Sequence, residues 1–349
     1  MSSLTDCARR AMGIAQGSPA DPHNGLPEPT AIKPMEWLFD ESSEGFDVAG
    51  AVESALVMLH AAREHDPRIM VDGGALAGGV SERAVRSSLG VEALEKSSLF
   101  YCYILGMARD GDTVSAIDFQ FDGARSLREL EPERIALRFA ENAVGSLGAV
   151  RGESFSGPVI LAPKAVTEIV VGPISASVSA SAVQKGTSRF REKLNARVAS
   201  ELLTITDDAT LRNGFATTAF DREGVAPEVL PLVEGGILRN FLHDSYTARK
   251  EGRRSNGHAG GGASDVPSVS TTNVVVSAGE SSLDEMIAGV ERGVLVTRFS
   301  GNTDHVSGDF SGVVKGGRMV RGGRLSEPLC GTMIAGNIFD LLPEVTAVS

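Results

Sequence analysis

The first helix that the hydrophobic pattern predicts begins after Asp47. Val48, Val52, Leu56 and Leu59 recur at intervals of three or four residues, which places them on one face of a helix. Asp47 belongs to the residue types that cap helix N-termini, and a proline follows beyond the last apolar position. The pattern therefore predicts a helix from residue 48 with this stripe turned toward the core.

A strand and a second helix follow. In residues 97–110 (SSLFYCYILGMARD), Phe100, Cys102 and Ile104 alternate with other side chains, a pattern typical of a half-buried strand. The second helix is predicted to start at Glu131, because the proline after it is tolerated in a first turn. Its expected buried stripe is Ile135, Phe139, Ala143 and Leu147. These elements predict an N-terminal α+β domain over residues 41–150.

The rest of the chain, residues 151–349, is richer in strands. One helix is expected after Ser282, which forms a capping box with Glu285, and Gly322-Gly323 has the composition of a hairpin turn. The expected strands are short apolar or β-branched runs: 159–161, 202–205, 274–276, 294–299 and 313–314. We therefore expect an α+β fold whose C-terminal domain is rich in β-structure.

Residues 1–40 have a different character. The segment is rich in proline and polar residues and shows little periodicity. We expect a proline-rich tail that is partly disordered.

Composition narrows the class of protein. The chain has 349 residues, enough for two domains, and no apolar run approaches the roughly 20 residues of a membrane helix. Three scattered cysteines and the absence of a secretory signal favour a cytoplasmic protein without a disulfide framework. The net charge of −12 disfavours nucleic acid as a partner.

The histidines exclude the usual helical zinc motifs. None of the six is followed by glutamate, so the chain contains neither HExxH nor HExxxH. His60 and His65 are five residues apart and diverge by roughly 140° around a helix, so one ion would not reach both. GxSxG and SxxK nucleophile motifs are also absent.

Two glycine-rich stretches remain as candidate binding loops. They are residues 256–265 (NGHAGGGASD) and 300–312 (SGNTDHVSGDFSG). Glycine permits unusual backbone angles and the close approach of another chain, while the polar residues suit either turns or a groove. From the residues alone, a binding loop and a flexible surface loop fit equally well.

Six segments in one order resemble the TldD/PmbA peptidase family. The resemblance spans roughly residues 45–345. The segments are HDPRIMVDGGAL (65–76), LEPERIALRFAENAVGSLGA (130–149), FDREGV…PLVEGGILRNFLHD (220–244), SYTARK…SNGHAGGGASD…SLDEMI (245–287), VSGDFSGVVKGGRMVRGGRL (306–325) and TMIAGN (332–337).

The resemblance implies a subunit without its own metal. The family includes a zinc-bearing TldD type, whose HExxxH helix follows a strand similar to PVILAP (158–163) here, and a zinc-free TldE/PmbA type. At the motif positions this chain has Val171, Gly172 and Ala176, which bind no zinc and move no proton. No counterpart of the zinc-binding type's C-terminal cysteine precedes Ser349. The resemblance thus implies no cofactor in this chain and zinc in a partner subunit.

By this resemblance the chain is expected to pair with a TldD-like zinc peptidase as a heterodimer and to help hydrolyse peptide or amide bonds. The family's first sheet-forming stretch has no counterpart, which predicts a specialised substrate such as one small peptide or N-acylated metabolite. The residues expected to face the substrate or the partner are Ser255, Gly257, His258, Gly260, Ser264, Asn302, Ser307, Gly308 and Asp309.

Two other functions stay open at this stage. One is a self-sufficient hydrolase without zinc, which would use Cys330, or His258 together with Asp309. The other is a binding or scaffold homodimer that performs no chemistry.

Overall fold

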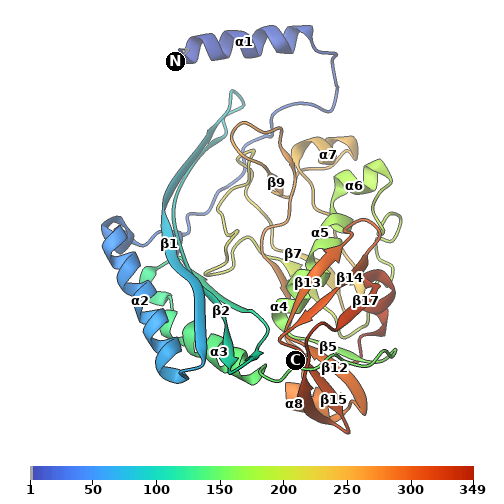
Figure 1. Ribbon diagram of the computed structural model, residues 1–349. Coiled ribbons are helices and arrows are strands. Elements are labelled where there is room, and N and C mark those ends of the chain that lie inside the picture. Colours follow the sequence, from blue (N-terminus) through green and yellow to red (C-terminus); the bar gives the residue numbers. More distant parts are fainter. Residues whose placement is uncertain (1–2) are drawn as a thin grey trace.

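Residues 48–145, the first part of the molecule below, form a long curved β-hairpin with helices on its outer side. We describe a computed structural model that covers residues 3–349 (Figure 1). The hairpin strands β1 and β2 pair antiparallel along almost their whole length, and β2 also pairs with β3 and β4. The strands are β1 (Ile69–Arg86), β2 (Glu92–Asp110), β3 (Thr113–Val114) and β4 (Asp118–Ala124).

The alternation in β2 sets the two faces of this sheet. Phe100, Cys102 and Ile104 are fully or almost fully buried, whereas Tyr101 between them is exposed. Successive side chains in a strand point to opposite faces, so the apolar set packs beneath the helices. The predicted strand and its buried side are confirmed.

Helices α2 (Val48–His65) and α3 (Pro132–Gly145) cover the buried face. Helix α2 begins at the predicted residue, and α3 begins at Pro132, one residue after the predicted Glu131. The Asp47 side chain accepts a hydrogen bond from the Gly50 N–H at 2.9 Å. The predicted stripe of α3 packs in the core through Ile135, Phe139 and Ala143, while Leu147 lies beyond the helix end.

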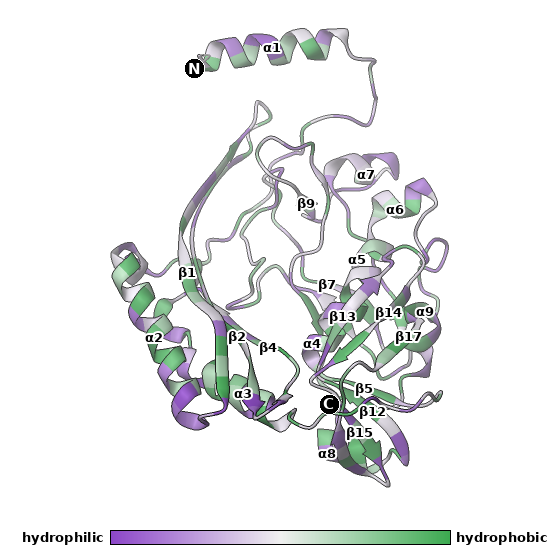
Figure 2. Ribbon diagram, viewed as in Figure 1, coloured by the Kyte–Doolittle hydropathy of each residue, from purple (hydrophilic) through white to green (hydrophobic). Residues whose placement is uncertain are grey.

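The expected buried stripe of α2 is wrong. Val48 is 80% exposed, and Val52 and Leu56 also face solvent, whereas Met58 and Ala62 are buried against the sheet. The helix is apolar on more than one side, so spacing alone did not identify the face that packs. Green residues lie along α2 in Figure 2 among the purple ones.

The second part contains four small sheets. The parallel pair β5–β12 is the exception among otherwise antiparallel pairings. The sheets have the strand orders β16-β15-β12-β5, β11-β6-β7-β8, β13-β14-β17 and β10-β9. The strands are β5 (Val159–Leu161), β6 (Ile205–Asp207), β7 (Leu230–Glu234), β8 (Ile237–Leu238), β9 (Ala259–Gly260), β10 (Ser268–Val269), β11 (Val274–Val276), β12 (Arg292–Val296), β13 (Arg298–Thr303), β14 (Asp309–Lys315), β15 (Arg318–Arg321), β16 (Arg324–Pro328) and β17 (Met333–Asn337).

Most of the predicted strands are present, with two shifts. The run 202–205 enters a strand only at Ile205. The run 294–299 is divided at Thr297, whose hydroxyl donates to the Gly316 carbonyl at 2.6 Å while the chain passes from one sheet to the next. The predicted α+β fold with a β-rich C-terminal part is confirmed.

The remaining helices of the second part are short. The Ser282–Glu285 capping box is present at the start of α8, as predicted. The helices are α4 (Pro163–Val166), the π-helical turn η4 (Thr167–Val171), α5 (Gly172–Val178), α6 (Ala180–Lys185), α7 (Ser245–Lys250), α8 (Leu283–Ala288), α9 (Ile338–Leu341) and the 3₁₀ turn η5 (Leu342–Glu344).

Buried polar groups join the two parts. The guanidinium of Arg125, which follows β4, donates to the carbonyls of Gly214, Phe215 and Thr217 at 2.7–3.1 Å. Glu95 in β2 accepts from the N–H of Ala219 at 2.6 Å. Charge-assisted bonds of this kind fix the hairpin against the second part.

The segment 1–40, which was expected to be a partly disordered tail, contains a helix. Helix α1 (Leu4–Gly17) carries a Ser3–Asp6 capping box, buries no residue and stands away from the body (Figure 1). The segment after it is held to the body by Arg249, which donates to the Gly25 carbonyl at 2.7 Å. The 3₁₀ turns η1 (Glu36–Leu38), η2 (Glu41–Gly45) and, after β4, η3 (Leu127–Glu129) complete the elements. The first two residues of the predicted tail lie outside the described residues.

Across residues 3–349, no single helix is long and apolar enough to cross a membrane. One adjoining pair, Glu36–Gly45 with Val48–His65, meets the length and composition criteria together but bends by 99° at its break.

The packing of α3 predicts a contrast between two neighbouring positions. Replacing the fully buried Phe139 by Ala should cost about 3–5 kcal/mol of unfolding free energy, because the ring leaves a cavity beneath the helix. Replacing Leu137, which is 37% exposed, should cost about 1 kcal/mol or less. Urea unfolding of both variants measures the difference, and equal losses would contradict the assigned packing face.

Candidate functional site

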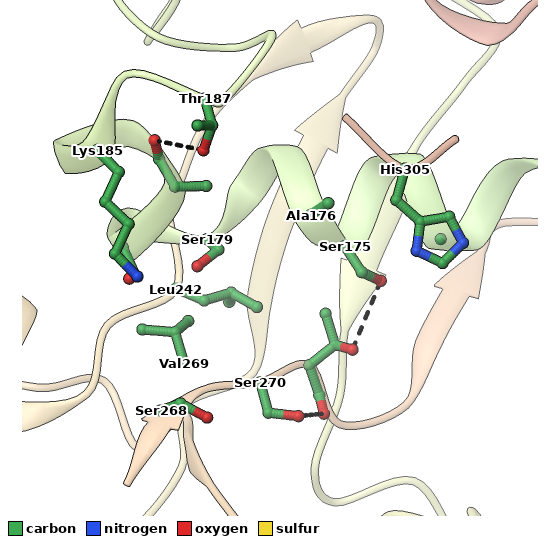
Figure 3. Close-up of a pocket in the computed structure, with 14 residues that line it drawn as sticks. Ser175, Ala176, Ser179, Lys185, Thr187, Leu242, Ser268, Val269, Ser270 and His305 are labelled. Carbon is green, nitrogen blue, oxygen red and sulfur yellow. Dashed lines mark hydrogen bonds between the residues drawn. The ribbon is translucent and has the colours of Figure 1, made fainter. Parts of the chain in front are cut away.

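A groove of about 500 Å³ runs along α5 and α6. Its other side is formed by β10 with the residues after it, and the turn between β13 and β14 places His305 at one end (Figure 3). The residues that line it include Gly172, Ser175, Ala176, Ser179, Ser181, Lys185, Thr187, Leu242, Ser268, Val269, Ser270, Thr271 and His305. Two of the three motif positions named above, Gly172 and Ala176, therefore lie in this groove.

The backbone before the groove departs from a regular α-helix. Residues Thr167–Val171 form a π-helical turn, and Pro173 follows Gly172 at the start of α5. Pro173 has no N–H with which to bond the carbonyl four residues earlier, so the regular ladder is interrupted there. Such turns inside helices are often found at functional sites.

The ring of His305 lies directly against this helix. A Cβ placed on Gly172 would be only 2.5 Å from the His305 Nε2 atom and 2.7 Å from its Cδ2 atom. The imidazole therefore takes the space of a side chain at position 172. A side chain at position 172 would therefore displace the exposed His305 ring.

The turn that carries His305 is fixed by its own hydrogen bonds. The Asp304 carboxylate accepts from the backbone N–H groups of Val306 and Ser307, each at 2.8 Å, and these bonds lower the pKa of Asp304. The same hairpin is tied to the π-helical turn, because Glu168 accepts from the N–H of Phe299 in β13. These bonds hold the backbone of the hairpin that carries His305.

The donor set of the groove does not fit zinc. It offers one imidazole, one ammonium group and several hydroxyls, and none of its lining residues is Asp, Glu or Cys. A catalytic zinc site needs about three nitrogen, sulfur or carboxylate ligands. Within the described part of the chain, no group of three such side chains gathers anywhere as a metal site.

The first predicted loop serves mainly as structure. His258 is buried, and its Nε2 atom lies 3.1 Å from the Oδ1 atom of Asp207, which is also buried. Gly257 is buried with φ +78° against Pro227, and the Ser255 hydroxyl donates to the His243 carbonyl at 3.0 Å. The polar groups of these three residues are used inside the fold and none of the three lines the groove, so their expected role toward the substrate or the partner stays a prediction.

Two further members of that loop have different surroundings. Gly260 pairs with Ser268 in the β9–β10 ladder, and Ser264 is exposed. Neither lines the groove.

The second predicted loop is a hairpin turn. Gly308 is buried with φ +85°, and a Cβ there would be 2.4 Å from the Phe339 ring. Asp309 accepts from Asn337 at 2.7 Å and from Ser307 at 2.8 Å, which lowers its pKa, and Asn302 is exposed in β13. None of the four predicted residues of this loop lines the groove, but His305, which lies between them in the sequence, does. The four are Asn302, Ser307, Gly308 and Asp309.

The alternative constellations are not assembled. His258 is bonded to Asp207, whereas Asp309 is bonded to Asn337 and Ser307. Cys330 is exposed, and its thiol donates to the Ala149 carbonyl at 3.2 Å. His60 and His65 are both exposed on α2.

The sequence interpretation missed the residues that form the groove walls. The signal that was available is the run ISASVSASA (174–182), in which every residue except Ile174 and Val178 is alanine or serine. Small residues on a helix permit close approach of another segment, so this run was a better indicator than the glycine-rich loops. His305 carried no such signal.

Family models match nearly the whole of both parts. The model of the PmbA/TldA metallopeptidase central domain matches residues 41–147, and the model of the C-terminal domain of the same metallopeptidases matches residues 154–349.

Individual relatives of both types are similar to the chain. The metalloprotease PmbA homolog of Buchnera aphidicola is 26% identical over 97% of this chain and 74% of the relative. The metalloprotease TldD homolog of the same organism is 27% identical over 98% of this chain and 74% of the relative. The crystal structure of TldE from Thermococcus kodakarensis has a TM-score of 0.89 and 25% identity, and covers 98% of this chain and 77% of that one.

The surroundings of His243 predict a pH effect on stability. This residue is 1% exposed, and within the described structure neither ring nitrogen has a hydrogen-bond partner. Burial lowers the pKa of His243 from 6.5, although the Glu251 carboxylate, 3.7 Å from Nε2, acts against this shift, so folding disfavours the charged ring. Below about pH 6.5 the unfolded chain binds a proton that the folded chain resists, and the stability that this position supplies above that pH is lost as the pH falls.

Thermal unfolding of the wild type and His243→Gln at pH 7.5 and 5.5 tests this effect. The wild type should lose more thermal stability between these pH values than the variant does. Burial raises the pKa values of Asp221 and Glu223, so these two groups favour the folded state as the pH falls. Both are present in the wild type and in the variant, so their effect cancels in the comparison. Parallel losses in the two proteins would show that His243 does not titrate as described.

Proposed function

Because the chain belongs to the PmbA/TldD (PmbA/TldA) metallopeptidase family, we propose that it is a non-catalytic subunit of the TldE/PmbA type. In this proposal it pairs with a zinc-bearing TldD-like partner, and the pair hydrolyses peptide or amide bonds. The zinc and the residues that activate water belong to the partner, and this chain needs no cofactor.

The observation that carries the proposal is the contact between Gly172 and His305. Position 172 is where a zinc peptidase of this family would carry the glutamate that activates water, and here the His305 ring fills that space. The neighbouring Val171 and Ala176 supply no ligand atoms. The structural similarity to a protein named TldE supports the TldE/PmbA type. The chain is also similar to a TldD homolog, so an experiment has to distinguish the two types.

A subunit without metal contributes by shape and backbone groups. Its groove can hold an extended substrate as an added strand. Hydrogen bonds between the main chains of the substrate and the protein then provide most of the affinity. Closing the partner's cavity also keeps bulk water out of the site where the reaction occurs. Asn302 and Ser264, which are exposed, remain proposed contacts for the partner or substrate.

The proposed substrate is a peptide or a small N-acylated compound that is processed at one bond. The proposed compartment is the cytoplasm, because three cysteines scattered along the sequence do not form the pattern of a disulfide framework.

Reconstitution tests the division of roles. The chain should be expressed alone and together with a family member that contains HExxxH, and each preparation assayed on an unstructured peptide. We expect hydrolysis only from the pair and its loss when the partner's motif glutamate is changed to Gln.

Two variants of this chain separate the alternatives. Cys330→Ala should leave the rate of the pair unchanged, because this exposed thiol lies outside the groove. Gly172→Glu should not confer activity on the isolated chain, since one carboxylate without ligands holds no zinc. Hydrolysis by the isolated chain that Cys330→Ala abolishes would instead establish a self-sufficient hydrolase. A stable homodimer that binds none of the HExxxH-containing family members would instead establish a scaffold protein.

A further inference from the structure

The groove has an electrostatic character opposite to that of the chain. The protein carries 45 acidic residues and a net charge of −12, yet no acidic side chain lines the groove. Its two basic side chains lie at opposite ends, Lys185 on α6 and His305 on the hairpin turn, with hydroxyl and apolar side chains between them (Figure 3). Such a surface attracts anionic groups that the rest of the protein repels.

Lys185 is available to a ligand. It is exposed at the end of α6, and its ammonium group forms no ion pair or hydrogen bond with the described residues. Two arginines that follow α6 in the chain already have partners. The Arg189 guanidinium lies over the Phe339 ring, and the Arg191 Nε atom lies 3.4 Å from the Glu192 Oε1 atom. Lys185 is therefore the cation that the groove presents without a partner in the described structure.

The strand β10 supplies a peptide-binding edge beside this cation. The Ser270 N–H donates to the His258 carbonyl at 2.9 Å, and Ser268 pairs with Gly260 in the same register. Hydrogen-bonding directions alternate along a strand, so the N–H and C=O of Val269 point away from β9. Val269 lines the groove, where an added strand would meet these groups.

We propose that the groove binds an extended peptide whose carboxylate is held by Lys185. The peptide main chain pairs with β10 at Val269, and the hydroxyls of Ser175 and Ser179 border its path toward His305. This inference rests on the proposed function in that it names the substrate class for the same groove. It assigns a selectivity for acidic ligands to a subunit that performs no chemistry.

Binding to matched peptides tests the proposal on the isolated chain. The probes are fluorescein-labelled peptides of Ala, Ser and Val, about eight residues long at roughly 3.3 Å per residue. One has a free C-terminal carboxylate, the second a C-terminal amide, and the third an amide preceded by Glu. Fluorescence anisotropy gives each dissociation constant.

We expect the free acid to bind about two- to fivefold more tightly than the neutral amide, because solvent screens an ion pair with an exposed lysine. Lys185→Gln should remove this preference. Lys193→Gln is the matched control, because Lys193 is also an exposed lysine and does not line the groove. Tight binding of the Glu-containing amide would show that a side-chain carboxylate serves as well as the C-terminus.

Three results would overturn the proposal: equal affinities for acid and amide, a preference that survives in Lys185→Gln, or no saturable binding of any peptide. Unchanged melting temperatures of both lysine variants show that the comparison concerns folded protein. Because the assay contains no partner, carboxylate-selective binding would stand even if the subunit role failed. Conversely, a hydrolysing pair without this selectivity would overturn only the present inference.

Discussion

The role proposed for this molecule depends on the contact between the Gly172 backbone and the His305 ring. It places an imidazole where a side chain at position 172 would project, 2.5 Å from the site of the absent Cβ. The contact requires a glycine on the helix, an interrupted helical ladder before Pro173, and a hairpin turn held by Asp304. Together these features turn the helix that would carry a zinc motif into one wall of a groove without metal ligands.

The surrounding polar groups show why the groove keeps its shape. The buried bond between His258 and Asp207 and the exposed bonds of Asp309 to Asn337 and Ser307 hold the segments beside it. Removing one partner of such a buried pair leaves an unsatisfied polar group, which is costly. These side chains therefore act as structure, and the chemistry available to a ligand comes from residues at the groove surface.

The sequence predicted the fold better than the site. Alternation in β2 and the caps at Asp47 and Ser282 are local signals, and each appears in the structure at the predicted residue. The packing face of α2 was not predictable by spacing, because apolar residues occur around much of that helix. His305 and Lys185 lie 120 residues apart in the chain and meet the same groove only through tertiary packing, so no local pattern identifies them.

Locating the zinc within the assembled pair tests the central claim most directly. Native mass spectrometry of the complex with an HExxxH-bearing family member, followed by gas-phase release of the subunits, assigns the metal to one chain. The account predicts that zinc remains with the partner and that this chain is released at its metal-free mass. Zinc retained by this chain, with Gly172 and His305 unchanged, would contradict it.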